Sequence, residues 1–373
     1  MENRLYLSPP HMSGNEKKYI DLAFESNWIA PLGPNVDKFE STMNEYLGSH
    51  YAVAMTSGTA AIHIALVMLD VKPGDYVLCS SMTFVASANP VLYLGAEPVF
   101  IDSEHNSWNI CPRSLEKAMQ NLEKKPKALI VVDLLGQSAD YGEIKKVCDK
   151  YNLPIIEDAA EALGAKYNGI KCGTFGEYGV FSFNGNKILS TSGGGMLICK
   201  TKEQALRAKH LITQAREDAP YYLHTEVGYN YRMSNIVAGL GIAQLGILED
   251  RVNKKRFINK CYQEKLKDIS YIRFMPEPEW SYSNRWLTSI LVDDDSLLTP
   301  TEIISELEKN NIEARRLWKP LHSQPLFEKN KYFFDNESVC DSLFESGVSL
   351  PSGTQMTEKD IERVCNIIKN IKK

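Results

Sequence analysis

The sequence lacks the features that mark membrane, secreted and nucleic-acid-binding proteins. No apolar run reaches the roughly 18 residues that a membrane-spanning helix needs. Basic residues are not in excess, because 42 Lys and Arg stand against 47 Asp and Glu and the net charge is −5. Residues 1–16 contain no apolar segment of the kind found in a signal peptide. We therefore expect a cytoplasmic protein with no membrane or nucleic-acid partner.

Cysteine is present but follows no metal-binding or redox pattern. No two of the eight cysteines have the CxxC spacing. Several lie in apolar runs, such as Cys79 in YVLCS and Cys199 in MLICK, so we expect buried free thiols and no metal site. Hydrophobic residues make up 43% of the chain and charged residues 24%, which is typical of a folded globular protein.

Short apolar runs alternate with helical patterns between residues 50 and 200. The apolar runs are Tyr51–Met55, Tyr76–Cys79, Pro98–Ile101, Ala128–Asp133 and Pro154–Glu157, and the helical patterns are Thr59–Leu69, Ala86–Leu94, Arg113–Leu122 and Tyr141–Tyr151. Apolar residues are continuous within each run, which is typical of strands buried on both faces. The rhythm predicts an α/β fold with a mainly parallel central sheet covered by helices on both sides. Two later runs, Tyr178–Phe183 and Met196–Cys199, are expected to extend this sheet.

The remainder of the chain predicts a second domain. After Asn235 a long helical pattern begins apolar and becomes charged, as expected for a helix that leaves one core for another. Beyond it come a strand pattern at Trp286–Val292, a helix capped by Thr299 and Pro300, and a final helix near Thr357–Ile371. We predict a large α/β domain over residues 1–250 and a small α+β domain over residues 251–373.

The segment TSGTA, from Thr56 to Ala60, follows a predicted strand and opens a predicted helix. A helix N-terminus after a turn of small residues presents free N–H groups and a favourable dipole to an anion. Gly58 would allow a phosphate to approach the backbone, and Thr59 would add a hydroxyl donor. An ordinary helix cap is the alternative interpretation. The segment does not match the GxxxxGK[ST] pattern of nucleotide P-loops.

Three further candidates follow predicted strands. Asp158 ends the run PIIED, where ligands of open α/β sheets bind, although it could simply cap a helix. Lys187 follows another predicted strand and precedes the glycines 193–195; a partly desolvated lysine there can form a Schiff base, whereas a solvated surface lysine is the alternative. Phe84 could stack on a flat ring or pack in the core. Together with the anion site, these groups match pyridoxal 5′-phosphate (PLP).

The chain resembles the DegT/DnrJ/EryC1/StrS family of PLP-dependent nucleotide-sugar aminotransferases over essentially its full length. The motifs that carry the resemblance are Gly33-Pro34 with Phe39-Glu40, Thr56-Ser57-Gly58-Thr59-Ala60, Glu157-Asp158-Ala159-Ala160, Phe181-Ser182-Phe183 through Lys187, Gly193-Gly194-Gly195, and Gly228-Tyr229-Asn230-Tyr231-Arg232-Met233-Ser234. The resemblance implies fold type I of PLP enzymes, the aspartate-aminotransferase-like class.

The resemblance also implies roles for individual residues. Lys187 would bind the cofactor aldehyde and Asp158 the pyridinium nitrogen, and both would be catalytic. The other cofactor contacts would be Phe84 on the ring, Gly58, Thr59 and Ser182 on the phosphate, Glu161, and Asn230 reaching the phosphate in the neighbouring subunit. A homodimer with shared active sites follows. Glu161 stands where the family often has Gln or His, and Asp133 begins the stretch DLLG where the family often has HLYG.

Within the family, the pattern is most similar to the transaminases of the UDP-N-acetylbacillosamine pathway. The segments that indicate this are LSPPHM (7–12), SNWIAPLG (26–33), NRWL (284–287), RLWKPLH (316–322) and LPSG (350–353). Those enzymes aminate the C4 ketone of UDP-2-acetamido-2,6-dideoxy-4-keto-hexose with L-glutamate as donor, releasing 2-oxoglutarate. The expected substrate-binding residues are Asn27, Trp28, Ile29, Ala30, Asn186, Arg232, Arg316, Trp318, Lys319 and His322, with Arg285 as a further cation for the diphosphate.

Three alternatives remain open at the level of sequence. A sister aminotransferase could act on a dTDP-3-keto or GDP-4-keto sugar, because loops decide substrate choice. A non-catalytic, cofactor-binding regulator is disfavoured, since no basic stretch or DNA-binding extension accompanies the domain. A cysteine-dependent sulfur-transfer enzyme of the same fold would need a cysteine on a polar loop, whereas most cysteines here lie in apolar runs.

Overall fold

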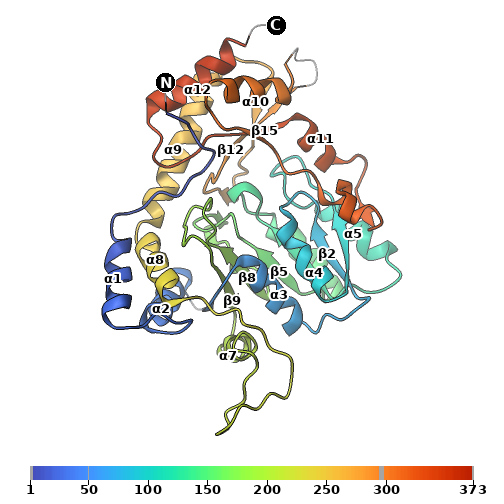
Figure 1. Ribbon diagram of the computed structural model, residues 1–373. Coiled ribbons are helices and arrows are strands. Elements are labelled where there is room, and N and C mark those ends of the chain that lie inside the picture. Colours follow the sequence, from blue (N-terminus) through green and yellow to red (C-terminus); the bar gives the residue numbers. More distant parts are fainter. Residues whose placement is uncertain (1–2, 49, 294–297, 372–373) are drawn as a thin grey trace.

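A sheet of eight strands runs through the larger part of the molecule (Figure 1). The computed structural model describes residues 3–48, 50–293 and 298–371. The strand order is β1 (Tyr51–Met55), β9 (Gly195–Cys199), β8 (Tyr178–Ser182), β5 (Ile155–Asp158), β4 (Ala128–Val132), β2 (Tyr76–Ser80), β3 (Glu97–Ile101) and β14 (Tyr332–Phe333). Only β9 runs antiparallel to its neighbours in this sheet. The predicted strands and the mainly parallel sheet are therefore confirmed.

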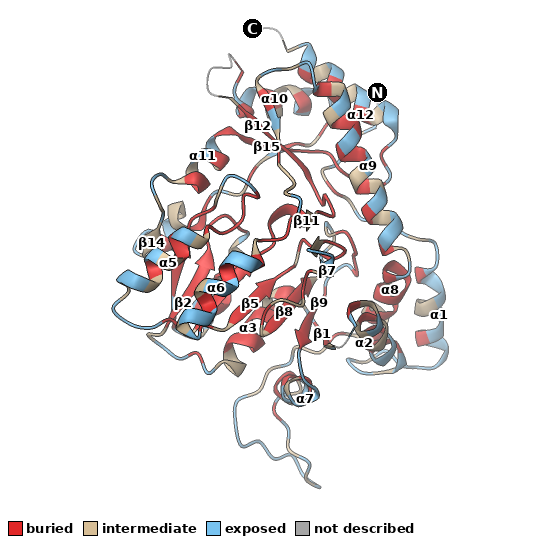
Figure 2. Ribbon diagram, turned by 180° about the vertical axis from the view of Figure 1, so that it is seen from behind, coloured by how far each residue is buried: buried red, intermediate tan, exposed pale blue. Residues whose placement is uncertain are grey.

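Helices cover both faces of this sheet. In Figure 1 the helices α3 and α4 lie in front of it, and in Figure 2 α6 lies in front from the opposite side. The covering helices are α3 (Gly58–Met68), α4 (Asn89–Tyr93), α5 (Pro112–Asn121), α6 (Tyr141–Tyr151) and α7 (Lys202–Leu211). Val77 and Cys79 of β2 join the apolar core beneath α3, whereas Tyr76 and Leu78 join the core beneath α5 and α6. Burial on both faces explains why the apolar runs do not alternate.

A smaller antiparallel sheet forms the upper part of the molecule in Figure 1. Its strands are β10 (Ile272–Phe274), β12 (Thr288–Val292), β15 (Gly347–Leu350) and β13 (Arg315–Arg316), and the helices packed on it are α9 (Leu248–Leu266), α10 (Pro300–Lys309) and α12 (Glu358–Lys369). These elements share a separate apolar core. Leu5 pairs with Ile312, so the start of the chain lies against this upper part. The α/β fold class with a small α+β part is confirmed.

The long helical pattern after Asn235 is divided into two helices. The first is α8 (Asn235–Leu245), and α9 begins at Leu248. Between them Gly246 has low helix propensity, and Ile247 adopts φ −120° and ψ 15°, outside the helical region. The break separates the apolar α8, packed against α1 (Glu16–Glu25) and α2 (Pro34–Leu47), from the charged α9.

Smaller elements complete the fold. These are a three-stranded sheet of β11 (Ser281–Tyr282), β6 (Lys166–Tyr167) and β7 (Ile170–Lys171), the helix α11 (Val339–Ser346), and the 3-10 turns η1 (Val85–Ser87), η2 (Leu134–Gly136), η3 (Leu321–Ser323) and η4 (Pro325–Phe327). All eight cysteines are buried and free, as predicted. In the described ranges, none of the helices combines the length and apolarity required to cross a bilayer.

The strand β9 packs closely on the N-terminus of α3. A Cβ atom on Gly195 would lie 2.2 Å from the carbonyl carbon of Ser57 and 2.3 Å from the nitrogen of Gly58. Both contacts are with backbone atoms, so no side-chain rotation relieves them. Glycine at 195 is therefore required by space.

We predict that Gly195→Ala lowers the free energy of unfolding by about 3 kcal/mol, because overpacking forces α3 away from the sheet. Gly193→Ala is the matched control, since nothing lies within 4 Å of a Cβ atom there. Thermal unfolding of the two variants checks this. Equal melting temperatures for both variants would show that α3 can move away from the sheet without lowering the stability of the fold.

Candidate active site

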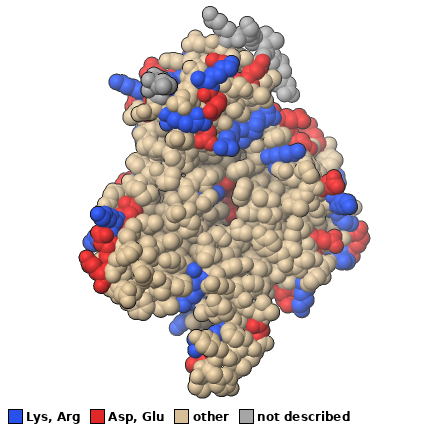
Figure 3. Space-filling view, in the orientation of Figure 1, with Lys and Arg blue, Asp and Glu red and all other residues tan. Residues whose placement is uncertain are grey.

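A cavity of about 180 Å³ opens at the carboxyl ends of β5 and β8. The predicted cofactor residues that line it are Gly58, Thr59, Phe84, Asp158, Glu161, Ser182 and Lys187. The face seen in Figure 3 is hollowed near its centre, and acidic and basic atoms lie together inside the hollow. Of the predicted cofactor contacts, only Asn230 lies outside the cavity; it is exposed and pairs with Thr213.

The N-terminus of α3 forms one end of the cavity. The Ser57 hydroxyl caps the helix by accepting a hydrogen bond of 3.0 Å from the Ala60 N–H. A Cβ atom on Gly58 would lie 3.1 Å from the Ser182 Cβ, so glycine allows α3 and β8 to approach closely. Free N–H groups of the first turn, the helix dipole and the nearby hydroxyls of Thr59 and Ser182 provide the donors that a phosphate requires.

Asp158 is the buried carboxylate of the cavity. One carboxylate oxygen accepts a hydrogen bond of 2.7 Å from the Ser87 hydroxyl, and the other accepts one of 3.2 Å from the Ala160 N–H. Burial raises the pKa of Asp158, while Ser87 and the positive charge of Lys187 act in the opposite direction. A protonated pyridine nitrogen would be a suitable partner for this carboxylate. Its positive charge would stabilise the ionised carboxylate, which burial disfavours.

Lys187 reaches the cavity from the turn after β8. Its side chain is only 12% exposed, and its Nζ lies 3.3 Å from Glu161 Oε1. The same Nζ lies 4.3 Å from the centre of the Trp286 ring. The other Glu161 oxygen accepts a hydrogen bond of 2.7 Å from the Leu135 N–H. Burial raises the pKa of Glu161, and the charge of Lys187 opposes this shift.

These residues fit PLP in their chemistry. A helix N-terminus and hydroxyls suit the phosphate, a carboxylate suits the ring nitrogen and an amine suits the aldehyde. Phe84 is 52% exposed and packs against Trp318 at a ring-centre distance of 5.4 Å, so one of its faces is available to a planar ring. The arrangement can bind an aldehyde covalently and move a proton beside it.

The sequence did not single out Ser87 or Trp286 as site residues. Ser87 lies in η1, a short turn with no distinctive pattern, and only its contact with Asp158 identifies it. Trp286 belongs to the NRWL segment and begins a predicted strand pattern; it is almost fully buried, and its ring lies against Lys187. In the sequence, the only signal for Trp286 is that it directly follows Asn284 and Arg285.

The residues expected to bind substrate lie at several places. Asn27, Trp28 and Ile29 are exposed between α1 and α2 and do not line the cavity, while the Ala30 carbonyl accepts a hydrogen bond from the Asn235 N–H. Lys319 and Asn186 are exposed, and Arg232 is half-buried beside Met55.

Other expected contacts are already engaged within the chain. The Arg316 guanidinium donates to the carbonyls of Phe344 and Glu345, at 2.7 and 2.8 Å. His322 hydrogen-bonds Ser81 at 2.7 Å through Nδ1 and Asp341 at 3.3 Å through Nε2. Burial lowers the pKa of His322, and Asp341 opposes the shift. Trp318 reaches the cofactor cavity only through Phe84.

Buried contacts within the chain account for Arg285 and Asp133, two residues that the sequence analysis singled out. Arg285 is not available for a diphosphate, because it pairs with Glu277 at 2.9 Å and donates to the Met275 carbonyl. Asp133, at the family's histidine position, accepts hydrogen bonds from the Ala139 N–H and the Tyr141 hydroxyl. Burial and Glu157 raise the pKa of Asp133, which is fully buried and does not line the cavity.

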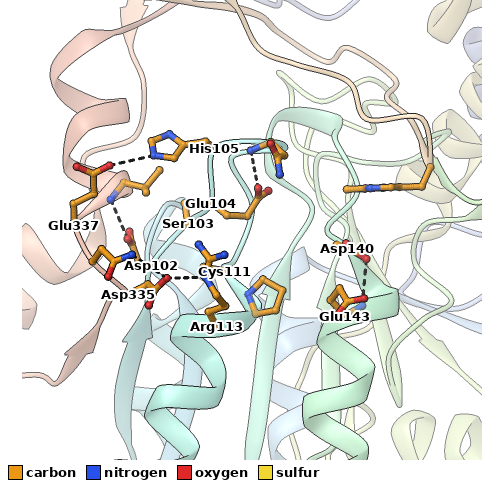
Figure 4. A pocket seen from close by; sticks show the side chains of 15 residues that line it. Asp102, Ser103, Glu104, His105, Cys111, Arg113, Asp140, Glu143, Asp335 and Glu337 are labelled. Atoms are coloured by element: carbon orange, nitrogen blue, oxygen red, sulfur yellow. Dashed lines mark hydrogen bonds and ion pairs between the residues drawn. The ribbon is translucent and has the colours of Figure 1, made fainter.

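A larger cavity of about 480 Å³ lies beyond β3 (Figure 4). The carboxylates that line this cavity already form hydrogen bonds or ion pairs with neighbouring residues. Asp102 accepts from two N–H groups at the start of α11, Arg113 pairs with Asp335 at 2.6 Å, and His105 lies 3.5 Å from Glu337. These contacts hold the segment before α11 against the large sheet, so this cavity is not the candidate active site.

Comparisons with known proteins agree with this geometry. The DegT/DnrJ/EryC1/StrS aminotransferase family model matches residues 10–369. EpsN of Bacillus subtilis, assigned as a pyridoxal phosphate-dependent aminotransferase, is 52% identical over 373 residues, covering 99% of this chain and 96% of EpsN. GDP-perosamine synthase of Vibrio cholerae is 34% identical over 363 residues, covering 97% of each chain.

Solved structures give the same result. A DegT DnrJ EryC1 StrS aminotransferase from Brucella abortus superposes with a TM-score of 0.88 at 29% identity, covering 95% of each chain. The sugar aminotransferase Spr1654 of Streptococcus pneumoniae, in its PLP-form, superposes with a TM-score of 0.90 at 25% identity, covering 99% of this chain and all of that one. The chain therefore belongs to the DegT/DnrJ/EryC1/StrS family of sugar aminotransferases, which bind PLP.

Proposed function

We propose that this protein transfers the amino group of L-glutamate to the C4 ketone of UDP-2-acetamido-2,6-dideoxy-4-keto-hexose. The products are UDP-4-amino-4,6-dideoxy-N-acetylglucosamine, which is a bacillosamine-type amino sugar, and 2-oxoglutarate, which is glutamate after it has lost its amino group. The observation that carries the proposal is one cavity that combines the Lys187 amine, the buried Asp158 carboxylate and the N-terminus of α3. A UDP-4-amino-4,6-dideoxy-N-acetyl-beta-L-altrosamine transaminase of Campylobacter jejuni, 30% identical over 352 residues, supports the UDP-linked substrate.

Lys187 performs the proton transfer. When bound, PLP supplies the electron sink for cleavage of the bond between the α-carbon of glutamate and its hydrogen. The Lys187 amine, which would hold the cofactor aldehyde, would take this proton from the α-carbon of glutamate and return it to the aldehyde carbon of the cofactor. In the second half-reaction the same amine would work in the opposite direction on the sugar carbon, so one base serves both half-reactions and ping-pong kinetics are expected.

The neighbouring residues keep this amine productive. Glu161 lies 3.3 Å from Lys187 Nζ and is itself held by the Leu135 N–H, so it orients the amine. The Trp286 ring closes the other side and limits access of water. Asp158 keeps a proton on the ring nitrogen, and Ser87 fixes the carboxylate in place. The half-buried Arg232 and the exposed Lys319 would receive the diphosphate of the sugar nucleotide.

A second candidate is the amination of a GDP-linked keto sugar. GDP-perosamine synthases of Vibrio cholerae and Escherichia coli are 34% and 33% identical to this chain. The purified enzyme, glutamate and a panel of UDP-, GDP- and dTDP-linked keto sugars, with products weighed by mass spectrometry, separates these candidates. We expect the UDP-4-keto sugar to be aminated with the highest kcat/KM. Preference for the GDP-linked sugar would replace the first proposal by the second.

We also propose a homodimer whose active sites are shared. Asn230 belongs to a family motif, yet it is exposed and outside the cavity of its own chain. It ends a segment that projects beyond α7 at the bottom of Figure 1 and exposes Tyr221, Tyr222 and Val227. Apolar side chains that project in this way are typical of a surface that another subunit covers.

Lys187→Ala is expected to abolish transamination while leaving noncovalent cofactor binding. The amine that holds the aldehyde and carries the proton is lost, but the phosphate cradle remains. Absorbance spectra with and without glutamate, together with product formation, measure both effects. Lys202→Ala, at an exposed position on α7, is the control. Near-normal turnover by the Lys187 variant would contradict the assignment.

Asp158→Asn should keep the fold and lower kcat/KM by about 10²-fold or more, which corresponds to about 3 kcal/mol. The amide is nearly isosteric with the carboxylate but does not hold the ring nitrogen protonated. Steady-state kinetics with the preferred keto sugar measure the loss, and Asp149→Asn on the exposed face of α6 is the control. A loss below tenfold would mean that Asp158 serves only the Ala160 turn.

Mixing two inactive variants tests the shared site. Asn230→Asp places a negative charge opposite the phosphate and should inactivate both sites of a dimer. If Asn230 serves the partner, a dimer of one Asn230→Asp chain and one Lys187→Ala chain has one site with both defects and one with neither. Activity then returns to about half per heterodimer. Verified subunit exchange without recovered activity would assign Asn230 to its own chain.

A further inference from the structure

A second, very small cavity lies beside the reactive lysine. Its volume is about 10 Å³, room for one water-sized occupant. The residues that line it are Ser8, Pro9, His11, Lys187, Ile188, Ser190, Gln244, Arg251, Lys255 and Thr354. None of these described residues is acidic, whereas Lys187, Arg251 and Lys255 are cationic. Because Lys187 also lines the cofactor cavity, the two cavities are neighbours.

Lys255 is a buried ammonium with neutral partners. It is 2% exposed, and its Nζ donates to the Ser8 hydroxyl at 3.0 Å and to the Trp286 carbonyl at 2.9 Å. An ammonium has three donors, so these bonds leave one donor unassigned. Among residues 3–48, 50–293 and 298–371, Lys255 forms no ion pair with a carboxylate, although it sits on the long helix α9 with acids elsewhere along its surface.

Arg251, one helical turn earlier on α9, adds a second charge to the same cavity. Its Nη1 donates to His11 Nδ1 at 2.6 Å, and its Nη2 donates to the His11 carbonyl at 2.9 Å. Its Nε is buried, and within the described part of the chain it has no hydrogen-bond partner. Glu16, which acts on Arg251 at longer range, already accepts from the N–H groups of Ser13 and Gly14 and from Gln244.

Two cations that line one small, largely buried cavity are costly unless a negative charge joins them. Burying an unpaired charge is unfavourable, and proteins relieve this cost by losing the proton or by pairing the charge. Burial and the charge of Arg251 lower the pKa of Lys255 to about 7. Burial and Arg251 also lower the pKa of His11, with Glu16 opposing the shift.

We propose that this cavity binds one monatomic anion, chloride under physiological conditions, between Lys255 and Arg251. The unassigned donors of Lys255 and Arg251 Nε supply the charge-assisted contacts, and the hydroxyls of Ser190 and Thr354 lie in the same lining. The size of the cavity excludes carboxylate and phosphate ligands, which leaves a halide as the class of anion. The proposal of this anion site does not depend on which nucleotide sugar is the substrate, because no nucleotide sugar takes part in it.

Crystals of the PLP-loaded enzyme grown or soaked in sodium bromide give the direct test. We expect an anomalous bromide peak between Lys255 Nζ and Arg251 Nε, and no such peak in Lys255→Met crystals. A cavity that holds only water, with no bromide peak in the wild-type protein, overturns the proposal. This measurement uses the unaltered chain and therefore stands even if Lys255→Met fails to fold.

Thermal unfolding in solution is the second test. At equal ionic strength and pH 6.5, potassium chloride should raise the Tm of the wild-type holoenzyme by about 2 °C or more over potassium gluconate, because a ligand that binds only the folded state stabilises it. The chloride effect should persist in Lys260→Met, an exposed position on α9, and vanish in Lys255→Met. It should also weaken at pH 9, where Lys255 releases its proton. An equal chloride effect in both variants would assign it to the protein surface and refute the site.

Discussion

The active site depends on one geometric constraint, namely that neighbouring parallel strands end at the same edge of a sheet. Asp158 ends β5 and Ser182 ends β8, and these strands are hydrogen-bonded neighbours. Phe84 follows β2 and Gly58 follows β1, so residues far apart in the chain meet in one cavity. Each strand supplies one group, and the helices that follow the strands supply the N–H donors.

A second requirement is that charges in this cavity balance. Asp158 and Glu161 are both buried acids, and burial raises the pKa of each. Lys187 opposes both shifts, so the two acids and one amine form a coupled group with room for one more positive charge, which a protonated ring nitrogen brings. The glutamate at 161, where the family often has a neutral or basic residue, thus becomes the direct partner of the reactive lysine. Nearby, Lys255 and Arg251 present the opposite case, because neither cation forms an ion pair with an acid among the described residues.

The hydrogen bonds around Lys187 also join the two sheets. The Asn186 carbonyl accepts from the Trp286 indole at 2.7 Å and from the Ser8 hydroxyl at 2.9 Å. Trp286 immediately precedes the strand region of the upper sheet, and Ser8 belongs to the N-terminal segment. The position of Lys187 is therefore set by contacts from two distant parts of the chain, and a shift of the upper part relative to the large sheet would reach the lysine through them.

The sequence by itself determined the order of strands and helices, because continuous apolar runs such as Tyr76–Ser80 and capped helices such as Pro300–Lys309 are local patterns. It also predicted Gly58, Asp158 and Lys187 as site residues, since strand ends are where ligands of such sheets bind, and the structure brings all three to one cavity. Only the tertiary structure decided which polar groups remain free. Arg285 pairs with Glu277, eight residues away, and His322 bonds Asp341 and the distant Ser81. No local pattern of the sequence indicates these partners.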